Sequence, residues 1–316
     1  MLVNLGANMF GATVDTCILI LENSKNKDEL QAVDLVKRSQ EPKKRLENMS
    51  DYIEQNKLKS SYQKDESWLI LSPIEQSIKN KIESIGTPLK DWNIQINRGI
   101  LTGCNEAFII DENKRRELIE KDPKSAEIIR PILRGRDIKK YDYEFKNLYL
   151  ICTFPSKHYN INDYPAIKDH LLSFDKRKLE QSGQKNIDGI KGNNARKKTN
   201  NKWFETQDSI SYWDDFNKPK IVFSRISGDT PCFALDNNRC MVNDTAYIIT
   251  GDNIKYLLDR LCSPEYWFAF RRFYMGGGIE KEFKVNNLKN LPIPFPNSKP
   301  LELSEIERKY IYSFQN

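Results

Sequence analysis

The stretch that decides the fold is Arg98-Gly-Ile-Leu-Thr-Gly-Cys-Asn-Glu-Ala-Phe-Ile-Ile110, in which a polar turn runs directly into an apolar segment. Gly99 and Gly103 flank an apolar pair and give the backbone conformational freedom there. Thr102 and Asn105 add hydrogen-bonding groups within the turn. The pattern predicts a turn followed by a strand. A turn held this close to a strand can present side chains accurately, as a binding site requires. An ordinary loop-to-strand connection would carry the same local signals, so the neighbouring motifs must decide between a binding turn and an ordinary connection.

Four further short motifs follow in a fixed order. They are Arg134-Gly-Arg-Asp-Ile138, Trp203-Phe-Glu205, Lys218-Pro-Lys-Ile-Val222 and Leu291-Pro-Ile-Pro294. Together with the 98–110 stretch, this ordered set resembles the TaqI-like C-terminal specificity domain. In that family the domain is the part of certain adenine-specific DNA methyltransferases, and of fused type II restriction-modification enzymes, that recognises the target DNA sequence. The resemblance implies a mixed α/β fold with flanking helices and double-stranded DNA as the partner.

Composition and charge narrow the class of protein. The chain has 316 residues, 39% hydrophobic and 30% charged, which is typical of a globular protein with one large or two modest domains. No run approaches the roughly 18 apolar residues that cross a bilayer. The N-terminus lacks the layout of a secretion signal, so we expect a cytoplasmic protein without a membrane partner. The net charge of +6 is compatible with a polyanionic partner but does not identify one.

The six cysteines are scattered without a Cys-x-x-Cys pair, and the chain contains only two histidines. This pattern argues against both a structural zinc site and a disulfide framework. We therefore expect no metal site and reduced thiols.

Four regions are expected along the chain. Residues 10–20, Phe-Gly-Ala-Thr-Val-Asp-Thr-Cys-Ile-Leu-Ile, resemble the closing strand of a methyltransferase domain, which implies that residues 1–22 are a remnant of that domain's edge. A helical linker is expected over 23–84, with a strand at 30–37 and a helix at 41–56. Its clearest signal is the capping box Ser72-Pro-Ile-Glu75, which predicts a helix that stops at Gly86. The target-recognition domain is expected over 85–297, and a C-terminal helix over 298–316.

Hydrophobic patterns predict the elements inside the recognition domain. The expected helices cover 113–120, 124–132 and 165–180, and the expected strands cover 148–153, 220–227, 232–235 and 245–250. Residues 181–202 are rich in Gly, Asn and Lys and contain little to bury. They predict a segment that is mobile unless a ligand orders it.

Candidate DNA contacts are the basic and polar side chains of these turns and strands. They are Arg98, Thr102, Asn105, Arg134, Arg136, Lys139, Lys140, Arg196, Lys197, Lys198 and Arg225. Arg134 and Arg136 flank a glycine, and arginine suits paired contacts with guanine or phosphate. The basic run at 196–198 predicts phosphate anchors, which set register without reading sequence. The alternative for the 134–140 loop is a surface ion-pair network with Asp137 and Asp142.

No catalytic residue is predicted. The chain contains neither a glycine-rich cofactor loop after a first strand nor the Asn/Asp-Pro-Pro-aromatic motif of adenine methyltransferases. The resemblance therefore implies that S-adenosylmethionine belongs to the parent enzyme and not to this chain. The methyltransferase domain would lie upstream in the same protein or on a separate subunit.

Two functions of other classes stay open. A metal-dependent nuclease would use Glu282-Phe-Lys284, with Asp259 as a second acidic ligand. A protein-interaction subunit would present the same basic loops to an acidic partner. Only the nuclease should lose DNA cleavage when Glu282 is replaced by alanine. Only the DNA-recognition module should prefer one DNA sequence over others.

Overall fold

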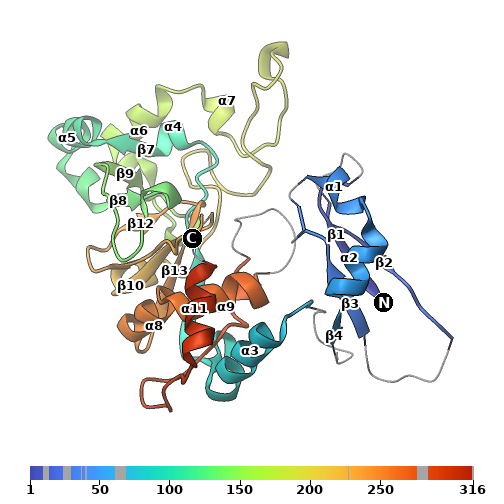
Figure 1. Ribbon diagram of the computed structural model, residues 1–316. Coiled ribbons are helices and arrows are strands. Elements are labelled where there is room, and N and C mark those ends of the chain that lie inside the picture. Colours follow the sequence, from blue (N-terminus) through green and yellow to red (C-terminus); the bar gives the residue numbers. More distant parts are fainter. Residues whose placement is uncertain are drawn as a thin grey trace. The chain divides into compact units, whose positions relative to one another are not determined.

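The computed structural model describes residues 1–9, 14–23, 30–36, 38–39, 41–60, 69–226, 228–275 and 284–314. The chain divides into two compact units. Unit 1 comprises Met1–Thr87, Phe268–Glu280 and Asn290–Asn316, and unit 2 comprises Pro88–Trp267 and Lys281–Lys289. Each unit contains both helices and sheet strands (Figure 1), which confirms the mixed α/β class. β5 (Thr87–Pro88) and α9 (Pro264–Ala269) span the boundaries between the units.

The N-terminal part of unit 1 is a four-stranded sheet in the order β2-β1-β3-β4. Its elements are β1 (Leu2–Gly6), β2 (Thr16–Leu19), β3 (Leu30–Asp34), α1 (Pro42–Leu46), α2 (Met49–Asn56) and β4 (Leu58–Ser60). Val3, Leu5, Val33 and Leu35 form a small buried core. The helix expected over 41–56 is two helices, because the backbone at Asn48 is left-handed, with φ 45°. The strand expected at 30–37 is present as β3, and the expected linker region also contains β4, which was not predicted.

The rest of unit 1 is held together by two helices with capping boxes. Its elements are α3 (Pro73–Ile85), the π-helical turn η8 (Phe270–Tyr274), β14 (Pro292–Ile293) and α11 (Glu305–Ser313). The expected capping box at Ser72 is present, and its Glu75 also forms a 2.7 Å ion pair with Arg272. Glu307 of the second capping box forms a 2.7 Å ion pair with Lys81 of α3. These contacts join three separate parts of the chain.

Unit 2 is built on an antiparallel sheet in the order β11-β10-β13-β6. Its strands are β6 (Ile94–Arg98), β10 (Lys220–Ser224), β11 (Phe233–Asp236) and β13 (Ala246–Gly251). Every residue of β10 is buried, as expected for a central strand. The strands expected at 220–227, 232–235 and 245–250 correspond to β10, β11 and β13.

A second sheet in unit 2 has the order β12-β8-β9-β7, in which β12 and β8 are parallel. Its strands are β7 (Ile109–Asp111), β8 (Ile129–Leu133), β9 (Leu148–Ile151) and β12 (Met241–Val242). The helix expected over 124–132 is wrong. A short 3-10 turn (Pro123–Glu127) leads into β8, where β-branched side chains pack in the sheet.

Short helices surround these sheets. They are α4 (Asn105–Phe108), α5 (Glu112–Lys121), α6 (Pro165–Leu172), α7 (Lys176–Leu179), α8 (Ile254–Leu261) and α10 (Val285–Leu288), with 3-10 turns at Leu89–Asp91, Gly135–Asp137, Pro155–Lys157, Ile161–Asp163, Ile187–Gly189 and Trp213–Asn217. The helix expected over 165–180 is split into α6 and α7. Among the described residues, no helix is long and apolar enough to cross a membrane.

Unit 2 buries one complete ion pair in its first sheet. Lys220 of β10 and Asp236 of β11 are both 0% exposed and contact each other directly. The Lys220 ammonium also donates to the carbonyl of Phe216, at 2.8 Å. Asp236 accepts the Tyr143 hydroxyl at 2.9 Å and the backbone N–H of Cys240 at 2.9 Å. Because Tyr143 follows the 134–140 loop, this network ties that loop to the sheet.

Candidate functional site

The centre of the site is the 243–245 turn, which connects β12 to β13. Its backbone joins segments that lie far apart in the sequence. The Asp244 N–H donates to the Ile100 carbonyl at 3.0 Å, and the Arg225 N–H donates to the Thr245 carbonyl at 2.8 Å. The Gly135 N–H donates to the Thr245 hydroxyl at 2.8 Å. The turn therefore brings together the predicted 98–110 turn, the 134–140 loop and Arg225 of the predicted strand 220–227.

Two glycines explain how the loops approach this turn so closely. A Cβ atom at Gly99 would lie 1.9 Å from the Asn243 carbonyl oxygen, and one at Gly135 would lie 2.3 Å from that of Thr245. Real Cβ contacts are never this short. Only glycine fits at these positions while the backbone keeps its present path.

We expect Gly135→Ala to destabilise the protein by about 1–3 kcal/mol, because the new methyl must push the 3-10 turn away from Thr245. Urea unfolding measures this loss. Gly228→Ala is the matched control, because a Cβ at Gly228 meets nothing within 4 Å. It should change the free energy of unfolding by less than about 0.5 kcal/mol. Equal stability of the two variants would contradict the close approach.

The arginines around the turn differ in what they contact. Arg98 is exposed and lies 3.7 Å from the Asp244 carboxylate. Arg134 donates to both carboxylate oxygens of Asp137, each at 2.8 Å. Burial raises the pKa of Asp137, but the hydrogen bonds from Arg134 outweigh this effect and leave the pKa below its usual value. Arg134 therefore forms the ion pair with Asp137 that was expected as the alternative to DNA contact in this loop. Arg136, by contrast, has an exposed side chain.

The other basic residues of this region lie on either side of the turn. Lys139 and Lys140 are exposed further along the same loop, beside β11, where the Tyr141 N–H donates to the Phe233 carbonyl at 2.7 Å. Arg225 follows the end of β10 and is half-buried. The structure thus places Arg98, the 134–140 loop and Arg225 around one turn.

Thr102 and Asn105 form the second part of the site. Thr102 is fully buried, and its hydroxyl donates to the Asn105 side-chain oxygen at 2.7 Å. Thr102 is therefore not accessible to DNA in this structure, and it acts by shaping the turn. Asn105 is exposed at the start of α4.

Arg196 does not have the role of phosphate anchor that the basic run 196–198 predicts. Its side chain is buried and makes five hydrogen bonds, of 2.5–2.8 Å, to the backbone carbonyls of Leu179, Thr102, Glu205 and Trp203. Burial lowers the pKa of the Arg196 guanidinium to about 10. All five N–H donors of an arginine are used, so none remains for a phosphate. Arg196 is a structural clamp.

Lys197 and Lys198, by contrast, are exposed beside this clamp. Burial raises the pKa of the Asp208 carboxyl, while the positive charges of Lys197 and Arg98 both act to lower it. The Asp208 N–H donates to the Leu101 carbonyl at 3.2 Å. The positive charges of Lys197 and Arg98 therefore act on the same carboxylate. Lys197 and Lys198 directly follow Arg196, which bonds to the Thr102 carbonyl in the 98–105 turn.

Sequence reasoning missed the residues that organise the site. Asn243, Asp244 and Thr245 form a polar tripeptide between two apolar strands, which is a recognisable turn signal. Nothing local in the sequence shows that Gly99 and Gly135, over 30 residues apart, pack on this same turn.

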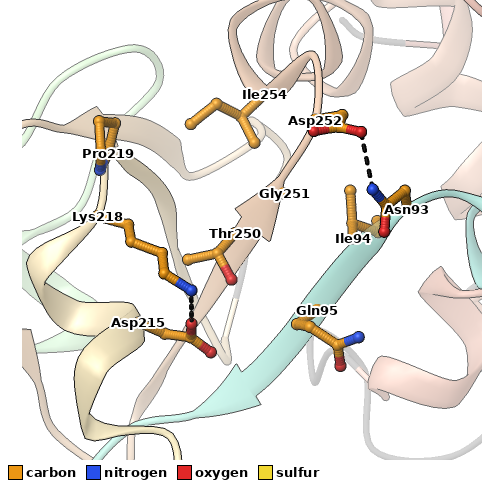
Figure 2. Close-up of a pocket in the computed structure, with 10 residues that line it drawn as sticks. All are labelled: Asn93, Ile94, Gln95, Asp215, Lys218, Pro219, Thr250, Gly251, Asp252 and Ile254. Carbon is orange, nitrogen blue, oxygen red and sulfur yellow. Dashed lines mark hydrogen bonds and ion pairs between the residues drawn. The ribbon is translucent and has the colours of Figure 1, made fainter.

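A separate pocket of about 480 Å³ lies at the other end of the β6–β13 pair. In Figure 2, Lys218 and Asp215 face each other across a 2.7 Å ion pair, and Asn93 donates to Asp252 at 2.8 Å. Thr250 lies between these two pairs. None of the predicted DNA-contacting residues lines this pocket.

The structure describes only some of the residues that the nuclease alternative would use. Glu282 lies outside the described residues, whereas Asp259 is exposed on α8. Within the described ranges, no group of three or more His, Cys, Asp or Glu side chains is arranged to hold a metal ion.

Comparison with known proteins identifies the family. The model of the TaqI-like C-terminal specificity domain matches residues 130–293, slightly more than half of the 316-residue chain. The chain therefore belongs to this family. No curated protein matches it in a sequence comparison.

Two solved structures are similar to the chain at low identity. The type IIG restriction endonuclease BpuSI is 13% identical, with a TM-score of 0.44, and the match covers 100% of this chain and 38% of that one. The type IIL restriction-modification enzyme MmeI, in complex with DNA, is 10% identical, with a TM-score of 0.41 and coverage of 92% and 33%. The chain thus spans less than two fifths of the length of either enzyme.

Proposed function

We propose that this chain is the target-recognition module of a restriction-modification enzyme and binds a specific sequence of double-stranded DNA without covalent chemistry of its own. The observation that carries the proposal is the 243–245 turn. It holds Arg98, the 134–140 loop and Arg225 in one region by hydrogen bonds of its backbone and of the Thr245 hydroxyl. Membership of the specificity-domain family supports the same function.

The side chains of the site suit two different kinds of contact. Lys139, Lys140, Lys197 and Lys198 are exposed ammonium groups, which neutralise phosphates and fix the register on the duplex. Arg136 is exposed on a loop anchored at both ends, and a positioned arginine can bond to two acceptors of guanine in the major groove. In this proposal the lysines supply affinity, and the arginines supply sequence preference.

The proposal assigns methyl transfer to a partner domain. An adenine-specific methyltransferase, in the same protein or on a second subunit, would hold S-adenosylmethionine and take the target base out of the duplex. The edge strand β2 supports such a partner, because exposed apolar side chains are unusual on a sheet edge in contact with water. Ile18 and Leu19 of β2 are exposed, and so are Val14, Ile20 and Leu21 next to it in the sequence.

Fluorescence anisotropy of a labelled random-sequence duplex, titrated at several salt concentrations, tests DNA binding. We expect affinity to fall steeply with salt, by about 0.9 log units per log unit of salt for each phosphate contact. Replacing Lys139 and Lys140 by alanine should lower the magnitude of this log-log slope by the amount expected for two phosphate contacts.

The control variant removes the same charge elsewhere in unit 2. Lys90 and Lys255 are exposed beyond the Ile94–Gly251 end of the β6–β13 pair, whereas the 243–245 turn lies at its other end. Lys90→Ala/Lys255→Ala should leave the slope unchanged. No binding at low salt would contradict the proposal and would favour an acidic protein as the partner.

A further inference from the structure

Residues 183–196, called the arm below, form an irregular hairpin whose two halves are hydrogen-bonded to each other, although the composition of this segment predicts that it is mobile. The Gly183 N–H donates to the Arg196 carbonyl at 2.9 Å, and the Ala195 N–H donates to the Gln184 carbonyl at 2.9 Å. Nearer the apex, the Ile187 N–H donates to the Asn193 carbonyl at 2.6 Å. In Figure 1 this yellow-green segment leaves α7, turns and returns. Its two halves are thus bonded to each other along its length.

Two braces hold the arm on unit 2. At its base, the Arg196 guanidinium bonds to carbonyls on both sides of the arm, including that of Thr102. Near its apex, Arg177 of α7 donates to both carboxylate oxygens of Asp188, at 2.7 and 2.8 Å. Ile187 is fully buried beneath the apex. The arm is therefore held in position before any ligand binds.

The apex of the arm exposes one large apolar side chain. Ile190 is 59% exposed, within a tight turn in which Gly189 and Gly192 have positive φ angles of 72° and 85°. Lys185 and Lys191, which precede and follow it in the sequence, are also exposed. An apolar side chain in contact with water is unfavourable in free energy, and burying Ile190 against an apolar group of a ligand would be favourable.

We propose that Ile190 contacts the 5-methyl group of a thymine in the major groove of the target DNA. The inference rests on the proposed function and adds the chemistry of one base contact. The major groove is about 12 Å wide and admits two adjacent backbone segments, as in a two-stranded ribbon, whereas the minor groove is only about 6 Å wide. The paired halves of the arm therefore suit the major groove. The 5-methyl of thymine is the apolar group that the major groove presents, so an isoleucine there gains most from a thymine.

The test uses the preferred duplex of the protein, selected from a random pool. Each thymine is replaced in turn by deoxyuridine, which lacks only the 5-methyl group. We expect one replacement to weaken binding by the wild-type protein about fourfold, the value of burying one methyl-sized group. Ile190→Ala should bind the thymine duplex about fourfold more weakly and lose its sensitivity to that replacement. Ile306→Ala, at a 72% exposed position of α11, should behave as wild type.

The contrary outcomes are separable. A wild-type protein insensitive to every replacement, a preferred site without thymine, or an Ile190→Ala variant as sensitive as wild type would each overturn the inference while leaving DNA recognition intact. If the wild-type protein binds no DNA, the proposed function fails, and this inference fails with it.

Discussion

Replacing Asp236 by alanine is expected to lower the free energy of unfolding by about 3–5 kcal/mol, because it leaves the buried ammonium of Lys220 without its carboxylate. Both side chains are 0% exposed. Burial lowers the pKa of Lys220, so the protein already holds this charge at a cost. The same change removes the acceptor of the Tyr143 hydroxyl and loosens the anchor of the 134–140 loop.

Urea unfolding followed by circular dichroism measures this effect. Glu117→Ala is the comparison, since Glu117 forms ion pairs with Lys114 and Lys121 on the exposed face of α5. Exposed ion pairs of this kind contribute little to stability. We expect a loss far smaller than that of Asp236→Ala. Similar losses for the two variants would show that the buried pair does not hold the sheet.

The second large effect is expected for Arg196→Met, which removes five hydrogen bonds and leaves four carbonyls without this donor. Each buried polar group left unsatisfied costs about 1–3 kcal/mol. The base of the arm should come loose, together with Lys197 and Lys198. We expect DNA affinity to fall and the log-log salt slope to decrease by about two units, because two phosphate contacts are lost.

A double-mutant cycle separates positioning from general destabilisation. In a protein that already carries Lys197→Ala and Lys198→Ala, the change at Arg196 should not lower the salt slope further. Arg196→Lys keeps the charge but supplies three donors instead of five, so it should restore only part of the slope. Additive effects of the three changes would contradict a positioning role. Thermal unfolding confirms that each variant is folded before binding is measured.

Local signals in the sequence predict local structure well in this protein. The capping box at Ser72 and the stop at Gly86 gave α3, because both act within a few residues. The central strands β10 and β13 were predicted from apolar, β-branched runs. The helix expected over 124–132 failed for a non-local reason. The isoleucines of that segment are also spaced as a helix would need them, but pairing with β9 and β12 places Ile129 and Ile132 in a strand.

The candidate site shows the same division. Exposed basic residues such as Arg136, Lys197 and Lys198 could be nominated from composition and motif order. Arg196 has the same local context as Lys197, yet it is buried, because carbonyls from distant segments converge on it. The 243–245 turn was missed because its importance depends on Gly99 and Gly135 packing against it. Sequence spacing alone cannot show that convergence.

The central claim is that this chain distinguishes one DNA sequence from others. The most direct measurement is selection of bound duplexes from a random pool, followed by the affinity of the selected sequence relative to random DNA at physiological salt. We expect one sequence to be enriched and to bind at least about 10³-fold more tightly than random DNA. A pool that stays random after repeated selection, although the protein binds it, would contradict sequence recognition by this chain.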